Sequence, residues 1–214
     1  LSSCWRLFAS EKTERSDRKE FVLAMKKYVL IGGVNGAGKS TLYQTTQGLK
    51  TMKRVNTDEL VKEIGDWRNL TDVISAGKVA VKLIDQYFTE GISFNQETTL
   101  CGRSVIKNIR RAKALGYIVE LHYIGVDSVE IAKQRVKNRV EKGGHGIPER
   151  DIEKRYYESF QNLKEVLDEC NLVAFYDNTE EFRRFAIYKN GENVVLSHKV
   201  PKWYSNLLLG RKDE

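Results

Sequence analysis

The sequence predicts an α/β protein of three layers, in which helices cover both faces of a mostly parallel, five-stranded sheet. Short apolar runs alternate with longer amphipathic segments from residue 28 to residue 176, which is the pattern of strand–helix–strand units. The run at 117–124 is apolar almost throughout, as a strand buried on both faces of a parallel sheet requires. With 214 residues, 41% of them hydrophobic, the chain is long enough for one domain with a sizeable core.

The first predicted strand leads directly into a glycine-rich run, Gly-Gly-Val-Asn-Gly-Ala-Gly-Lys-Ser-Thr at residues 32–41. Gly33, Gly38, Lys39 and Ser40 have the spacing of a phosphate-binding P-loop between a strand and a helix. Glycines let successive backbone N–H groups point inward at an anion, and the dipole of the following helix adds positive charge. The pattern predicts a nucleoside triphosphate site, with a glycine-rich turn that binds nothing as the alternative.

The P-loop pattern also assigns roles to its residues. Lys39 is expected to contact the β- and γ-phosphates, and the Ser40 hydroxyl to ligate Mg²⁺. The predicted nucleotide-binding residues of the loop are Gly33, Asn35, Gly36, Ala37, Gly38, Lys39, Ser40 and Thr41. The loop does not indicate which molecule receives the phosphate.

Apolar periodicity and turn residues predict the remaining elements. The expected strands after the P-loop cover residues 53–56, 92–96, 117–124 and 172–176. The first expected helices cover residues 40–47, 69–90 and 102–115. The next helix is expected to be capped by Asp127 and Glu130 and to stop at Gly143-Gly144. The last is expected to begin at Pro148, with the core stripe Ile152, Tyr156, Phe160, Leu163 and Leu167. Asn190-Gly191 predicts a C-terminal β-hairpin, and the tail around Trp203 a short helix.

The start of the chain differs in composition from the rest. It opens on Leu1, and residues 11–20 are nearly all charged or polar, whereas Met25 stands just before the first strand. We expect residues 1–24 to be a disordered or weakly helical extension, Met25 to be the natural start, and residues 25–214 to form the domain.

Charge and cysteine content limit the partners and the compartment. The net charge of +7 favours an anionic partner, and nucleotides or phosphorylated metabolites qualify as well as nucleic acid. The three cysteines show no paired spacing, which favours a reduced, cytoplasmic setting. No run approaches the roughly 18 apolar residues of a membrane span, so no membrane partner is expected.

Polar residues follow three of the predicted strands, at the carboxyl end where ligands bind in open α/β sheets. Asp58 is the candidate general base for an acceptor hydroxyl, and its alternative role is to cap the next helix. Glu97 is expected to hold Mg²⁺ through water or to bind the acceptor with Thr98, and the alternative is a Thr98 helix cap beside an incidental Glu97. Asn178, after Asp177, is expected near the adenine or ribose, although both types are ordinary in turns.

Two arginines four residues apart, Arg135 and Arg139, share one face of a predicted helix. They are expected to neutralise charge on the transferring phosphoryl group, within a helical lid of about residues 135–155 whose hinge is Gly143-Gly144. Arg150 and Arg155 follow the lid turn, and Arg155 is expected to bind substrate. The alternative is an exposed basic face.

Two further residues have weaker assignments. Arg103 lies in the first turn of a helix, where a cation is unfavourable, so an anionic partner is expected, with a surface salt bridge as the alternative. His145 stands between glycines without other metal-ligand types nearby. It is interpreted as a structural residue or a lid contact.

Four segments together resemble the zeta-toxin family of P-loop kinases: residues 33–41, 97–104, 135–149 and 176–178. The resemblance runs from about residue 26 to residue 185. It implies a mobile basic lid, a hydroxyl of UDP-N-acetylglucosamine as the acceptor of the ATP γ-phosphate, a small helical antitoxin as a partner, and contact of Arg103 with substrate phosphate or sugar. The chain has little beyond the predicted core with which to build a large sugar-nucleotide site.

Three functions compete on these observations. The leading hypothesis is an ATP- and Mg²⁺-dependent kinase that phosphorylates a small molecule. The second is a nucleic-acid end kinase, which the basic helices favour but no RNA-binding signature supports. The third is a nucleotide-switched ATPase or binding protein without an acceptor, which has no need of Asp58 or the lid arginines.

Overall fold

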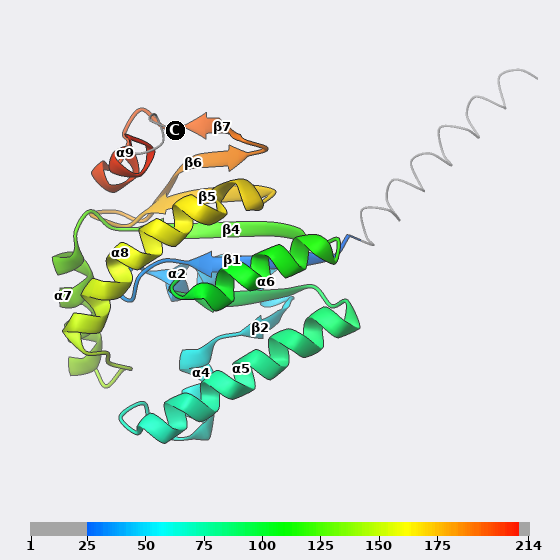
Figure 1. Ribbon diagram of the computed structural model, residues 1–214. Coiled ribbons are helices and arrows are strands. Elements are labelled where there is room, and N and C mark those ends of the chain that lie inside the picture. The colour runs from blue at the N-terminus through cyan, green and yellow to red at the C-terminus, as the bar shows by residue number, and fades with distance from the viewer. Residues whose placement is uncertain (1–24, 210–214) are drawn as a thin grey trace, which may run out of the picture.

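The computed structural model describes residues 25–209, which form one seven-stranded sheet with helices on both faces (Figure 1). The strands follow the order β2 (Lys53–Val55), β3 (Phe94–Thr98), β1 (Lys27–Gly32), β4 (Ile118–Gly125), β5 (Leu172–Asp177), β6 (Arg183–Lys189) and β7 (Glu192–Leu196). The first five are parallel neighbours, and β6 and β7 are antiparallel strands that extend the sheet beyond β5. The predicted parallel five-stranded sheet and C-terminal hairpin are confirmed.

Each face of the sheet has its own apolar core, because successive side chains of a strand point to opposite faces. In β1, Tyr28 and Leu30 are buried in one core, and Val29 and Ile31 in the other. The helices of the first core are α5 (Leu70–Glu90) and α6 (Arg103–Ala114), at the front of Figure 1, with the C-terminal half of α8 (Glu149–Val166) and α9 (Lys202–Leu209). The second core is covered by α2 (Lys39–Thr45), α3 (Gln47–Lys50), α7 (Val129–Glu141) and the N-terminal half of α8, through Ile152 and Tyr156.

Most element boundaries differ from the sequence prediction by one or two residues, and three differences affect the site or the caps. The third strand is Phe94–Thr98 and so includes Glu97. The helix expected over 40–47 ends at Thr45, and a separate short helix follows. Ser128, not Asp127, caps α7, because the Ser128 side chain accepts from the Ile131 N–H. The Asp127 carboxylate instead accepts from the Trp203 backbone N–H at 3.0 Å.

The predictions for residues 1–24 lie outside the described part of the chain. Within residues 25–209, no helix is both long and apolar enough to cross a membrane. Helix α9 confirms the short helix predicted for the tail around Trp203.

Parallel register brings the polar strand ends to one edge of the sheet. Gly32, the last residue of β1, pairs with Thr98 of β3 on one side and with Tyr123 of β4 on the other. The loop after β1 therefore begins beside Glu97. A further helix, α4 (Thr57–Ile64), starts directly after β2 at the same edge.

Close packing at Gly125 fixes the C-terminal helix on the sheet. The Trp203 indole lies against Gly125, where an added Cβ would be 2.3 Å from Cε2 of the ring. Its Nε1 donates to Asp177 Oδ1 at 3.2 Å. The chain thus returns after the hairpin to cover the end of β4, immediately behind the glycine-rich loop.

A pair of glycine substitutions tests this packing. Gly125→Ala should lower the free energy of unfolding by about 2 kcal/mol, because the indole cannot move without breaking its hydrogen bonds. Gly77→Ala, in α5 where nothing lies within 4 Å of an added Cβ, should raise it by about 0.5–1 kcal/mol. Urea unfolding of both variants measures the difference. Equal effects of the two substitutions would contradict the packing.

Candidate active site

The loop after β1 has the backbone that an anion-binding nest requires. Gly33 and Gly38 have φ values of 140° and 107°, which L side chains rarely adopt. A Cβ on Gly33 would also lie 2.3 Å from the Ile124 carbonyl oxygen of β4. Only glycine fits there, so the loop curls tightly over the sheet edge and α2 begins at Lys39.

Lys39 is buried within this loop. Its Nζ donates to the carbonyl oxygens of Gly33 at 2.8 Å and Val34 at 3.1 Å. Burial lowers the pKa of Lys39, with the charges of Arg139 and Arg155 acting in the same direction and those of Glu97 and Asp58 opposing them. Of these charged residues, Asp58, Glu97 and Arg155 line the same cleft as Lys39.

Asn178 supports the loop from the end of β5. Its Nδ2 donates to the Ala37 carbonyl oxygen at 2.8 Å, and its backbone N–H donates to Gly125 at 3.0 Å. The contact seen is with the loop backbone, and the predicted contact with adenine or ribose stays a prediction.

Asp58 lies in the first turn of α4 and does not cap the helix. Asn56 is the cap, because its Oδ1 accepts from the Asp58 N–H at 3.0 Å. The alternative reading of Asp58 as a helix cap is therefore wrong. Its carboxylate is 40% exposed and lies 3.7 Å from His145 Nε2, so it faces the cleft between α4 and the lid segment.

Glu97 lies beside Ser40, where oxygen ligands for a cation would be needed. The Ser40 hydroxyl donates to Glu97 Oε1 at 3.4 Å, and Glu97 Oε2 accepts from Arg54 at 2.7 Å and from Asn56 at 3.2 Å. A hydroxyl and a carboxylate oxygen are the hard donors that Mg²⁺ prefers. Residues 25–209 contain no cluster of three His, Cys, Asp or Glu side chains that could hold a metal. Mg²⁺ in kinase sites usually keeps several water ligands and binds substrate phosphates beside one or two protein groups.

Thr98 forms a turn at the end of β3. Its hydroxyl accepts from the Leu100 N–H at 3.0 Å, whereas the residue before α6 is Gly102. The alternative reading of Thr98 as a helix cap is wrong. The turn forces Leu100 to φ 59°, although its side chain is buried.

The two lid arginines are half-buried and incompletely paired. Arg135 Nη2 donates to the Thr179 carbonyl oxygen at 3.2 Å, but Arg135 Nη1 and Arg139 Nε and Nη2 are buried without a hydrogen-bond partner. Both line a hollow of about 380 Å³ together with Asn138, Lys142 and Gly144. Buried donors without partners are costly, so this hollow suits an anion and is more than a solvated basic face.

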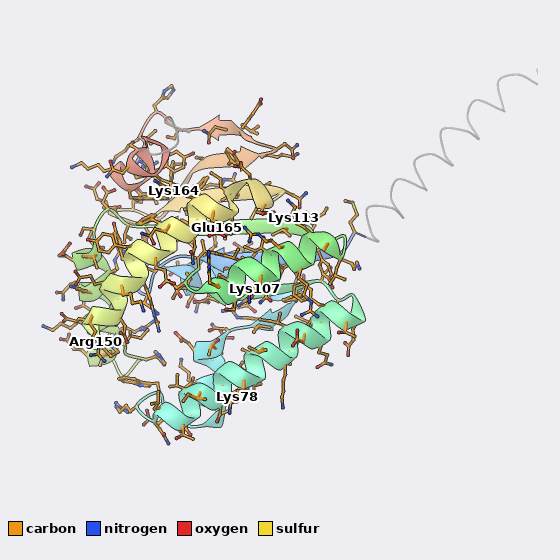
Figure 2. The ribbon with its side chains drawn as sticks, viewed as in Figure 1. Lys78, Lys107, Lys113, Arg150, Lys164 and Glu165 are labelled. Atoms are coloured by element: carbon orange, nitrogen blue, oxygen red, sulfur yellow. The ribbon has the colours of Figure 1, made fainter. Side chains whose placement is uncertain are left out.

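The structure does not bring every predicted arginine to the site. Arg155 Nη1 donates to Asn35 Oδ1 of the loop at 3.1 Å. Arg103 is 75% exposed and pairs with Glu165 on α8 at 2.8 Å, which is the surface salt bridge expected as its alternative. Arg150 is 88% exposed beside Asp151 and lies at the outer end of α8 (Figure 2).

A cleft of about 800 Å³ is lined by the loop, α4, the strand ends, the start of α5, the lid turn and α8. Lys39, Asp58, Glu97 and Arg155 line it, whereas Arg135 and Arg139 line the separate hollow described above. At its rim His145 lies 5.4 Å from the Trp67 ring, and a Cβ on Gly146 would lie 2.6 Å from that ring. Sequence reasoning missed Trp67, Asn56 and the approach of His145 to Asp58. An Asn before Thr-Asp was a usable cap signal for Asn56.

Stability against acid should depend on His145. Burial lowers the pKa of His145, although Asp58 opposes the shift and Arg139 adds to it. The unfolded chain then binds a proton more readily, so this contribution to stability is present above the ordinary histidine pKa of about 6.5 and is lost as the pH falls. Between pH 7.5 and pH 5, the unfolding free energy should fall more for the wild type than for His145→Asn. Equal falls in urea titrations would contradict the buried, neutral state.

A loop that cradles phosphates, facing a segment that carries arginines, is the arrangement of P-loop kinases, and the fold and site place the chain in that class. Sequence similarity assigns the chain to a family within that class. The profile of the zeta toxins matches residues 11–200, and the chain belongs to the zeta-toxin family. A protein of Haemophilus influenzae described as uncharacterized is 35% identical over 139 residues, which are 65% of this chain and 99% of that protein.

Two solved structures share the fold. The complex of AvrRxo1-ORF1 and AvrRxo1-ORF2 with ATP aligns with a TM-score of 0.67 and 15% identity, over 86% of this chain and 63% of the other. The chain thus spans less than two thirds of that protein. The PezAT toxin–antitoxin system of Streptococcus pneumoniae aligns with a TM-score of 0.59 and 20% identity, over 88% of this chain and 85% of the other.

Proposed function

We propose that the protein transfers the γ-phosphate of ATP to a hydroxyl group of a small molecule. The observation that carries the proposal is that Lys39, Arg155 and the two carboxylates Asp58 and Glu97, which come from separate elements, line one cleft. Cations are needed where charge develops on the transferring phosphoryl group, and a carboxylate is needed where the acceptor loses its proton. Family membership and a fold shared with a complex that contains ATP support ATP as the donor.

Each residue of the site has a separate role in the proposed reaction. The loop backbone and Lys39 hold the phosphates, and Arg135 and Arg139 stabilise charge on the γ-phosphoryl group. The acceptor oxygen attacks the γ-phosphorus, the bond to the β–γ bridging oxygen breaks, and ADP leaves. Asp58 takes the proton of the acceptor hydroxyl. Mg²⁺, held by Ser40 and through Glu97, would neutralise phosphate charge.

The acceptor is assigned only by class. The resemblance to the family supports a nucleotide sugar such as UDP-N-acetylglucosamine, with Glu97, Thr98 and Arg155 as candidate contacts. Arg103, predicted to contact substrate phosphate or sugar, lies outside the cleft and contributes no support. A small helical antitoxin remains the proposed partner, since one structural neighbour comes from a toxin–antitoxin system. A reduced compartment such as the cytoplasm suits Cys101, a free thiol in the cleft wall.

The alternatives fit the structure less well. All the basic residues of α6 except Lys107 form ion pairs: Arg103 and Arg110 bind Glu165, Arg111 binds Asp85, and Lys113 binds Glu169. This leaves less free charge for a nucleic-acid backbone. A switch without an acceptor would not need a carboxylate at the first turn of α4 facing a cleft. Labelled ATP with a metabolite extract, followed by mass spectrometry, tests for an acceptor directly, and ATP hydrolysis without any labelled product would favour the switch.

Asp58→Asn should keep ATP affinity and lose transfer to the acceptor by roughly 10²–10⁴-fold, because the amide cannot take the proton.

Lys39→Ala should abolish transfer by removing a phosphate contact worth several kcal/mol at the transition state. Transfer rates and ATP dissociation constants are measured for both folded variants. An Asp58→Asn protein that binds ATP more weakly but turns over normally would indicate a metal or structural role. Full activity in Lys39→Ala would refute the nucleotide site.

Arg139→Ala should lower turnover by about 10²-fold or more while ATP affinity changes only several-fold, because its unpaired nitrogens suit the charge of the transition state. Arg139→Lys should not restore full turnover, since an ammonium lacks the planar fork. Arg110→Ala, an exposed arginine of α6, is the matched control and should leave turnover unchanged. Normal turnover with alanine at both Arg135 and Arg139 would overturn the lid assignment.

A further inference from the structure

Arg54, outside the predicted site, contacts three of the elements that build it. It lies on the edge strand β2, and its side chain is only 10% exposed. The guanidinium lies 3.6 Å from the centroid of the Tyr43 ring on α2. It also pairs with Glu97 on β3 at 2.7 Å and with Glu59 on α4 at 2.9 Å. The three elements α2, β3 and α4 carry, in that order, Ser40, Glu97 and Asp58.

The plane of the guanidinium is fixed by its hydrogen bonds. Nε donates to Glu59 Oε2 at 2.9 Å, and Nη2 donates to both Glu59 Oε1 at 3.0 Å and Glu97 Oε2 at 2.7 Å. Nη1 donates to Asn95 Oδ1 at 3.2 Å. An ammonium group could not reproduce this planar set of contacts, so lysine is a poor substitute at this position.

These contacts decide how the Glu97 carboxylate is presented. Its two oxygens are chemically equivalent, and only their partners distinguish them. Oε2 is occupied by Arg54 and Asn56, which leaves Oε1 toward the Ser40 hydroxyl. Because the Glu97 side chain is only 9% exposed, its carboxylate would lose its ion-pair partner in a mostly buried position if Arg54 were absent.

We propose that Arg54 is a positioning residue for the proposed Mg²⁺ site at Ser40 and Glu97. It holds the Glu97 carboxylate with Oε2 engaged and Oε1 turned toward Ser40. The proposal rests on the proposed Mg²⁺-dependent kinase function. Groups that orient metal ligands typically change metal affinity by about 10–100-fold when removed. The competing role is a structural ion pair that only joins β2 to β3.

Metal affinity separates the two roles. The full chain is titrated with Mn²⁺, as a substitute for Mg²⁺, in the presence of a non-hydrolysable ATP analogue, and free Mn²⁺ is followed by electron paramagnetic resonance. Arg54→Met keeps an apolar stem beside Tyr43 and removes the fork. It should weaken Mn²⁺ binding by about tenfold or more and leave metal-free binding of the analogue unchanged. Arg54→Lys should restore only part of the loss.

The matched control is Glu59→Gln, which removes the other carboxylate that Arg54 holds. Glu59 is 49% exposed and lies outside the Ser40–Glu97 contact, so Mn²⁺ affinity should stay within about twofold of the wild type. If Arg54→Met binds Mn²⁺ as tightly as Glu59→Gln does, the positioning role is overturned.

Two further variants keep the outcome clear. Ser40→Ala should itself lose Mn²⁺ affinity, and no loss there would mean that the proposed metal site is wrong, whatever Arg54 does. If Arg54→Met fails to fold, Arg54→Met/Glu97→Gln removes the uncompensated charge and is compared with Glu97→Gln alone. Equal Mn²⁺ affinity in these two proteins supports action through Glu97. A further tenfold loss in the double variant would overturn it.

Discussion

Parallel pairing of β1 with β3 and β4 is the constraint on which the site depends. The pairing sets Gly32 opposite Thr98 and Tyr123, so the glycine-rich loop, Glu97 and the start of α4 meet at one edge of the sheet. A slip of one residue would move each side chain of a strand to the opposite face. Tyr28 and Ile31 belong to different cores, so a slip would move the large Tyr28 ring into the core that now holds Val29 and Ile31, and close packing resists such a change of volume.

The structure treats its buried cations in two ways. Arg54 is matched by two carboxylates, an amide oxygen and an aromatic ring, so it fixes the elements that it joins. Arg135 and Arg139 keep buried nitrogens without partners, and burial lowers the pKa of Lys39. An anion in the hollow lined by Arg135 and Arg139, or in the cleft lined by Lys39, would gain strong contacts with these cations, because a low-dielectric surrounding strengthens them. The protein thus combines carboxylates that Arg54 holds in place with guanidinium groups, those of Arg135 and Arg139, that lack some hydrogen-bond partners.

Two contacts hold the segment predicted as a lid against the rest of the site. Arg155 reaches back to Asn35 of the loop, while Gly146 packs on Trp67 in the connection between α4 and α5. The Trp67 contact requires glycine at position 146, since a side chain there would meet the indole. The lid turn therefore lines the cleft through packing as well as charge, with His145 Nε2 3.7 Å from the Asp58 carboxylate.

Much of this protein could be predicted from local sequence patterns. The alternation of strands with long helices, the parallel sheet and the loop that holds Lys39 follow from apolar periodicity and glycine spacing, because backbone geometry at these places depends on neighbouring residues. The short helices α3 and α4 were not among the expected elements. Boundaries were less secure: Ser128 and Asn56 cap their helices where Asp127 and Asp58 were candidates. Several residues that suit a cap stood side by side, and local pattern does not distinguish them.

Tertiary structure alone decided which charged side chains meet. Arg103 and Arg155 were both predicted to contact substrate, yet Arg103 pairs with Glu165 on the surface and Arg155 reaches the loop. Arg54 gave no signal in the sequence, since its partners lie on three other elements. The direction of a long side chain depends on which neighbours the fold places within reach, and those neighbours are distant in sequence. Residue type determined the chemistry available to the protein, and packing determined where that chemistry is assembled.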